Sequence, residues 1–167
     1  MKYRYAFLIF LFAFLIQGTF LNVFSLFHTT PNLILCLVVM FSLFYEKQLH
    51  AIVFGVLFGV IADLCFMQYT GISSLGYLLL ALCTMAAGST INRENLATLL
   101  LLTVFSTILF QIYVWVMYFF LGSRISILYV LGKLLVLVPY NVAVAAFLYH
   151  IFIGRVTRFR NDRYYYR

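Results

Sequence analysis

Asp63 is the residue of this sequence with the clearest potential for chemistry, because it is the only acidic residue inside a long apolar run. It ends a series at four-residue steps, Ala51, Gly55, Gly59 and Asp63, which places all four on one face of a helix. A carboxylate within a bilayer is costly, and such groups usually serve a function with a definable partner. We therefore treat this helix face as the candidate site.

Three roles are open for the Asp63 carboxylate. It could lock two helices together, contact a partner protein, or belong to a proton or ion path. Arg124 and Lys133 are the nearest basic candidates on the same side of the membrane. A transport path usually needs several embedded ionisable groups, and this sequence offers one. The pattern therefore favours a lock or a partner contact.

Gly55 and Gly59 form a G-x-x-x-G pair. Such a pair lets a second backbone approach closely and pack by van der Waals contact. The approaching backbone could belong to this chain's own bundle or to the membrane helix of a partner. Both interpretations fit the spacing.

The remaining chemistry-bearing residues form no recognisable site. The sequence has no nucleophile beside a base, no carboxylate pair and no phosphate-binding loop. Its histidines and cysteines are scattered without metal-ligand spacing, and the odd number of cysteines indicates free, buried thiols. We therefore expect no catalysis, no metal and no cofactor. The residues concerned are His28, His50, His150, Cys36, Cys65 and Cys83.

The composition identifies lipid as the solvent of most side chains. Of the 167 residues, 66% are apolar and 9% are charged, against about 45–50% and about 25% in ordinary soluble domains. This excludes a soluble enzyme, a nucleic-acid-binding module and a disordered chain. The net charge of +7 comes from residues at the chain ends and in short gaps, which is typical of membrane topology. Five arginines in the last 13 residues would also attract anionic lipid headgroups.

The apolar runs predict an all-α polytopic membrane protein, a bundle of about six transmembrane helices. Strands of a membrane barrel would alternate strictly between apolar and polar residues, and these runs do not. The predicted spans lie near 5–27, 30–45, 49–67, 72–91, 96–121 and 131–153. The second is shorter than the roughly 20 residues that cross a bilayer, so it either starts early or is half-inserted. We expect one domain over 1–154 and a basic cytoplasmic tail over 155–167.

Proline, glycine and serine mark the boundaries of these spans. Pro31-Asn32 separates the first two spans, because proline removes a backbone donor and restricts the residue before it. Gly71 suits a tight turn after the third span. Ser73 or Ser74 can then accept hydrogen bonds from free amides at the start of the fourth helix.

The last span contains both a proline and an asparagine. Pro139 predicts a kink, because its ring leaves a backbone carbonyl without a helical partner. Asn141 is placed to help satisfy that freed carbonyl.

Six spans put both ends of the chain on one side of the membrane. If that side is the cytoplasm, nine lysines and arginines lie inside and two, Arg124 and Lys133, lie outside. Basic residues concentrate in cytoplasmic loops. We therefore predict that both termini are cytoplasmic.

The order of these motifs resembles the MreD family, small polytopic rod shape-determining proteins of bacteria. The length, the lack of extramembrane domains, and a proline in the last span before a basic tail also fit that family. The resemblance covers the layout of the whole chain and the motifs of residues 31–77. The matching motifs are Pro31-Asn32, His50-Ala51, Gly55, Gly59, Asp63, Gly71-Ile72 and Leu75-Gly76-Tyr77.

The resemblance implies a non-enzymatic scaffold of the cell-elongation (rod) machinery in the bacterial cytoplasmic (inner) membrane. MreD-like proteins bind MreC, a single-span protein, and act with the RodA glycosyltransferase, its penicillin-binding transpeptidase and MreB filaments on the cytoplasmic face. The family's glycine–aspartate stripe falls by position on Gly55, Gly59 and Asp63, and its Pro-Asn pair on Pro31 and Asn32. Such a protein would position or activate peptidoglycan synthases and so maintain cell shape.

A rival interpretation is a substrate-binding membrane subunit of an energy-coupling-factor vitamin transporter, which is similar in fold to the MreD family. Those subunits typically dock through an Ala-x-x-x-Ala stripe in the first helix, whereas Ala6 and Ala13 are seven residues apart here. They also need a polar pocket open to the outside, and the outer loops of this chain are short and nearly uncharged. The scaffold is the preferred interpretation.

Overall fold

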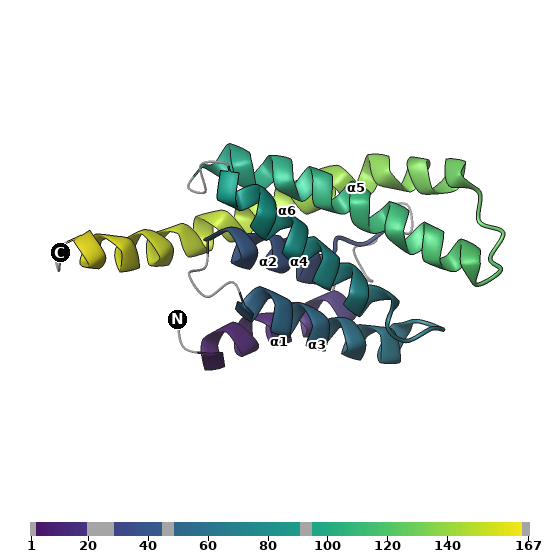
Figure 1. Cartoon of the computed structure of the whole chain (residues 1–167), viewed down its shortest axis with the longest axis horizontal. Helices are drawn as coiled ribbons and strands as arrows, with labels where there is room; N and C mark the ends of the chain where they lie inside the picture. Colours follow the sequence, from purple (N-terminus) through teal and green to yellow (C-terminus); the bar gives the residue numbers. More distant parts are fainter. Residues whose placement is uncertain (1–2, 20–28, 45–48, 91–94, 165–167) are drawn as a thin grey trace.

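The computed structural model describes residues 3–19, 29–44, 49–90 and 95–164, and these form six α-helices packed into one bundle (Figure 1). The helices are α1 (Tyr3–Thr19), α2 (Leu33–Phe44), α3 (Leu49–Phe66), α4 (Ile72–Thr90), α5 (Leu96–Phe120) and α6 (Ile127–Tyr164). The predicted all-helical bundle is confirmed over this part of the chain.

Most of the outward-facing surface of the bundle is apolar. Leu101, Leu128 and Leu135, for example, are more than 70% exposed, which is a stable arrangement in lipid and an unfavourable one in water. Within the described residues, three helices are long and apolar enough to cross a membrane, Leu49–Phe66, Leu96–Phe120 and Ile127–Phe152. Three shorter apolar helices cover Tyr3–Thr19, Leu33–Phe44 and Ile72–Gly88. The protein is therefore a multi-pass membrane protein.

The helix boundaries follow the sequence pattern in the middle of the chain and depart from it elsewhere. α3, α4 and α5 start at the predicted residues and end one residue earlier. α2 starts at Leu33 rather than near residue 30, because Asn32 caps it. α6 starts at Ile127 and continues to Tyr164, so most of the predicted tail prolongs the last helix. The predicted end of the first span, near residue 27, lies outside the described residues.

α2 is the central element of the bundle. Every side chain from Ile34 to Leu43 is buried, and α2 contacts each of the other helices, as its central place in Figure 1 also shows. Its 12 residues reach about 18 Å, against about 30 Å for a bilayer core. A helix that is apolar on all sides belongs in an interior. The other helices therefore pack around α2.

α1 packs onto the bundle through aromatic rings. Phe10 is fully buried, and its ring centroid lies 5.4 Å from that of Phe41, 5.7 Å from Phe54 and 5.9 Å from Phe58. Aromatic pairs at these separations add to the stabilisation that burial provides. Among the described helices, α1 contacts α2 and α3. It therefore covers one side of the pair that carries the candidate site.

The α3–α4 and α5–α6 connections lie side by side at one end of the bundle. The Tyr118 hydroxyl donates to Met67 Sδ at 3.6 Å, and the Tyr69 and Tyr118 ring centroids are 6.0 Å apart. α1 begins at the opposite end, where α6 runs past its neighbours (Figure 1). The first and last helices thus reach the same end of the bundle.

Candidate functional site

The glycine stripe of α3 lies inside the bundle. Ala51, Gly55 and Gly59 are all buried. A Cβ atom added at Gly59 would lie 2.6 Å from the Cα atom of Ser74, and one added at Gly55 would lie 2.8 Å from Val38 Cγ2. The first neighbour is backbone and cannot rotate away, so a side chain at position 59 would separate α3 from α4. The stripe therefore brings α3 against α2 and α4 of its own chain.

Tyr77 of α4 occupies the space that the two glycines leave. Cβ atoms added at Gly55 and Gly59 would lie 3.5 Å from Tyr77 Cβ and 2.9 Å from Tyr77 Cδ2. On its other side the tyrosine ring stacks on Phe110 of α5, with centroids 5.0 Å apart and planes 5° from parallel. Because Gly55 and Gly59 have no side chains, there is room between the helices for the side chain of Tyr77.

Asp63 holds the start of α4 through two backbone amides. Its Oδ2 atom accepts hydrogen bonds from the Gly71 and Ser73 N–H groups, each at 2.9 Å, and the residue has no exposed surface. The first amides of a helix have no partners within that helix, and their partial positive charge stabilises a carboxylate. Asp63 therefore caps the helix that follows its own.

Two expectations for this region were wrong. The hydrogen-bond partners of Asp63 are amides of the next helix, not Arg124 or Lys133. The serines do not supply the cap either, because Ser74 Oγ donates to the Gly71 carbonyl at 3.0 Å. Gly71 has a φ of 103°, a conformation that favours glycine, and the turn there brings the start of α4 back to the end of α3. Of the three roles open for Asp63, this geometry favours the lock.

A second polar centre surrounds the start of α2. Asn32 Oδ1 accepts a hydrogen bond from the Leu35 N–H at 3.0 Å, which makes Asn32 the N-cap of α2. Gln17 Oε1 of α1 accepts from the Ile34 N–H at 3.3 Å. Pro31, just before the cap, is buried. The first amides of α2 are thus bonded although they lie inside the bundle.

Asn32 also connects α2 to α4 and α6 directly, and to α5 through Asn141. Its backbone N–H donates to Asn141 Oδ1 of α6 at 2.8 Å, and its side-chain amide nitrogen lies 2.9 Å from the Tyr77 hydroxyl. Asn141 Nδ2 donates to Thr107 Oγ1 of α5 at 3.1 Å, and Cys36 Sγ donates to the Asn141 carbonyl at 3.4 Å. Because Thr107 is midway along α5, this centre lies deep in the bundle.

Two side-chain predictions outside the α3 stripe were wrong. Asn141 does not bond a carbonyl freed by Pro139, because its side chain bonds α2 and α5 instead. Cys36 is buried as expected, but Cys65 and Cys83 are exposed. An apolar run identifies a membrane helix without identifying which side of it faces lipid.

Tyr77 joins the predicted site residues into one continuous structure. Its side chain packs against the glycines of the stripe, and its hydroxyl bonds Asn32. Of the predicted residues, Ala51, Gly55, Gly59, Asp63 and Gly71 lie at the α3–α4 contact, and Pro31 and Asn32 lie at the start of α2. Sequence reasoning did not assign roles to Tyr77 and Thr107, although a polar group inside an apolar span indicates a need for a partner. Among the described residues, no three His, Cys, Asp or Glu side chains are grouped to hold a metal.

A comparison with known protein families finds a match that covers almost the whole chain. A family model described as the rod shape-determining protein MreD matches residues 1–158, which include every helix up to most of α6. No curated protein and no solved structure matches the chain.

Proposed function

The chain belongs to the MreD family of rod shape-determining proteins, and on that premise we propose that it is a scaffold for the membrane helix of an MreC-like protein. Family membership gives it a part in rod-shape determination, as a non-enzymatic membrane component of the rod complex. The proposal adds a mode of action. Helix packing within the bilayer would position or activate the peptidoglycan synthases, RodA and its transpeptidase, with MreB on the cytoplasmic side.

An apolar groove on the outward side of α3 supports this proposal. Gly55 and Gly59 pack inside the chain, so a partner helix has to use another side of α3. The groove is shallow and open, and it is lined by two rows of α3 side chains at four-residue steps. One row is Ile52, Val56 and Val60, and the other is Val53, Leu57 and Ile61.

The groove has the geometry and the chemistry that an apolar helix needs. Rows of side chains four residues apart are the ridges that interlock when two helices pack. All of the lining residues except Leu57 are β-branched, and such side chains have little rotamer freedom to lose on packing. The single span of an MreC-like protein is an apolar helix of this kind.

Filling the groove tests the proposal. Val56→Phe and Val60→Phe add bulk at partly exposed positions, and Leu101→Phe on α5 serves as the matched control at a position 71% exposed. Each tagged variant would be purified in mild detergent, and the co-purified MreC-like protein quantified by mass spectrometry. We expect several-fold less of it with the groove variants and wild-type amounts with the control. Equal recovery from all variants would overturn the groove assignment, and recovery of paired ATPases with a coupling subunit would overturn the scaffold.

We also propose that both termini are cytoplasmic, with a membrane domain over 1–154 and a basic tail over 155–167. The distribution of lysine and arginine supports this orientation. The exposed Cys65 and Cys83 would first be replaced by serine. A cysteine at Gln68 should then react with an impermeant thiol reagent applied from outside, and a cysteine at Asn92 should not. The reverse pattern would contradict the orientation.

A further inference from the structure

Two shielded polar atoms near the α3–α4 connection have no hydrogen-bond partner among the residues that the structure describes. They are Asp63 Oδ1, the second oxygen of the carboxylate that caps α4, and the Tyr113 hydroxyl of α5. Buried polar groups in proteins are nearly always hydrogen-bonded, either to protein atoms or to ordered water. Both atoms therefore indicate a site for a small polar molecule.

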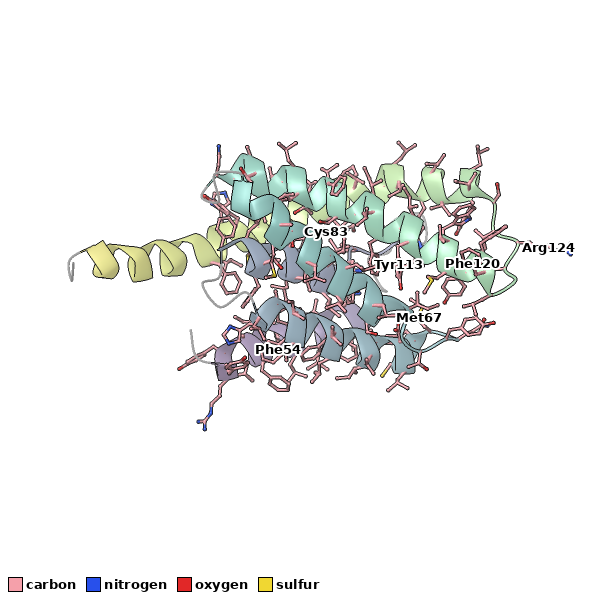
Figure 2. All side chains as sticks on the ribbon, in the orientation of Figure 1. Phe54, Met67, Cys83, Tyr113, Phe120 and Arg124 are labelled. Atoms are coloured by element: carbon pink, nitrogen blue, oxygen red, sulfur yellow. The ribbon has the colours of Figure 1, made fainter. Side chains whose placement is uncertain are left out.

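Both side chains lie against the first two turns of α4. The Tyr113 ring lies against α4 at Gly76, where an added Cβ would be 3.1 Å from Cε1. Gly76 is about one helical turn beyond Ser73, whose amide bonds the same carboxylate. In Figure 2, Tyr113 lies toward the end of the bundle where Met67 is labelled.

We infer that ordered water joins the two groups, donating a hydrogen bond to Asp63 Oδ1 and accepting one from the Tyr113 hydroxyl. An ionised carboxylate only accepts hydrogen bonds, and a phenol can donate one. Water does both and is the smallest molecule that can. A metal ion fits less well, because the described residues place no three His, Cys, Asp or Glu side chains together.

The open space beside Gly71 would give water access to this site. The Gly71 N–H bonds the Asp63 carboxylate, and apart from the two chain neighbours of Gly71 no described residue has an atom within 4 Å of the place where a Cβ would stand. The bridge would extend the Asp63 lock from two helices to three. The carboxylate would hold α4 directly and α5 through water. This inference does not rest on the proposed function.

Tyr113→Phe tests the water bridge because it removes the hydroxyl oxygen and keeps the ring. The direction in which the unfolding temperature changes distinguishes a bonded hydroxyl from an unbonded one. If water joins the hydroxyl to Asp63, the variant should unfold about 2–4 °C below the wild type in the same detergent, as expected for the loss of one hydrogen bond in a domain of this size. If the hydroxyl is unbonded, its removal should leave the midpoint unchanged or raise it, and that result would overturn the inference. Tyr129→Phe is the control, because Tyr129 is 64% exposed, and its midpoint should not move.

A second measurement links the effect to Asp63. In the Asp63→Asn background, the shift caused by Tyr113→Phe should shrink, since the two groups share one bridge. An equal shift in both backgrounds would contradict a shared water. Infrared difference spectra of the Tyr113→Phe variant give a readout that needs no Asp63 variant. The sequence has only four acidic residues, so an altered carboxylate stretch is assignable, and an unaltered one would count against the bridge.

Discussion

The Asp63 centre and the Asn32 centre hold the bundle together over very different distances along the chain. Asp63 bonds amides 8 and 10 residues further on. Asn32 bonds side chains 45 and 109 residues away. The first centre therefore fixes one helical hairpin, whereas the second fixes how the remaining helices assemble around α2.

The chemistry of the two centres also differs with depth in the bundle. The Asp63 centre lies three residues before the end of α3 at Phe66, and the deep centre uses neutral amides, hydroxyls and a thiol. A charge at the middle of a bilayer is far more costly than an amide that finds a partner. Depth therefore explains why a carboxylate serves one centre and asparagines serve the other.

The largest expected effect is at the close contact beside the Asp63 centre. Gly59→Ala should destabilise the protein by about 3 kcal/mol, because its Cβ would meet the Ser74 backbone at 2.6 Å. The unfolding midpoint in detergent measures this. Gly132→Ala in α6 is the control, since outside its own stretch of helix no described residue has an atom within 4 Å of its added Cβ. It should be neutral or stabilise by up to about 1 kcal/mol. Similar losses for both variants would contradict the close contact.

Removal of the carboxylate should have a large but local effect. Asp63→Ala leaves the Gly71 and Ser73 amides without their acceptor, at an expected loss of about 2–3 kcal/mol. Hydrogen exchange should accelerate at these two amides and stay slow at Leu35, which Asn32 caps. Asp63→Asn, which keeps an acceptor oxygen, should lose less. Equal acceleration at both centres would show that they are not independent.

Disruption of the Asn32 centre should cost less and spread further. Asn141→Leu removes the acceptor of the Asn32 N–H and the donor to Thr107, with an expected loss of about 1–2 kcal/mol. Exchange should accelerate at the start of α2 and leave the Gly71 amide unchanged. An effect confined to α6 would argue against the network.

The smallest effect is expected at the residue that connects the two centres. Tyr77→Phe keeps the ring on Gly55 and Gly59 and loses only the hydroxyl that bonds Asn32. We expect a loss of about 0.5–1 kcal/mol. In a double-mutant cycle with Asn141→Leu the two losses should not add, because both variants disturb Asn32. Strict additivity would separate Tyr77 from the network.

The local features were predictable because they follow from helical period and turn chemistry. Four-residue steps placed Ala51, Gly55, Gly59 and Asp63 on one face, and the structure buries that face as a unit. The starts of α3, α4 and α5 were correct because polar or glycine-containing stretches of sequence precede them. The Asp63 cap was missed, since its partners are backbone amides, which every residue except proline carries.

The long-range features were not predictable from one sequence. Asn32 and Asn141 each stand out as polar groups near or within apolar runs, but their pairing depends on how α2 and α6 come together. The same applies to α2 itself. Its short apolar run fits a span that starts early or a half-inserted helix, and only the packing of all its neighbours explains why ten consecutive side chains are buried.

The hydrogen bond between Asn32 and Asn141 has a consequence for biosynthesis. The two residues are 109 positions apart, which at about 5–20 residues per second separates their synthesis by roughly 5–20 seconds. During that interval α2 is already made, but its partner on α6 has not yet left the ribosome. The interior of this protein can therefore close only when translation is nearly finished, and a chain cut short before α6 would lack the last contact that secures its centre.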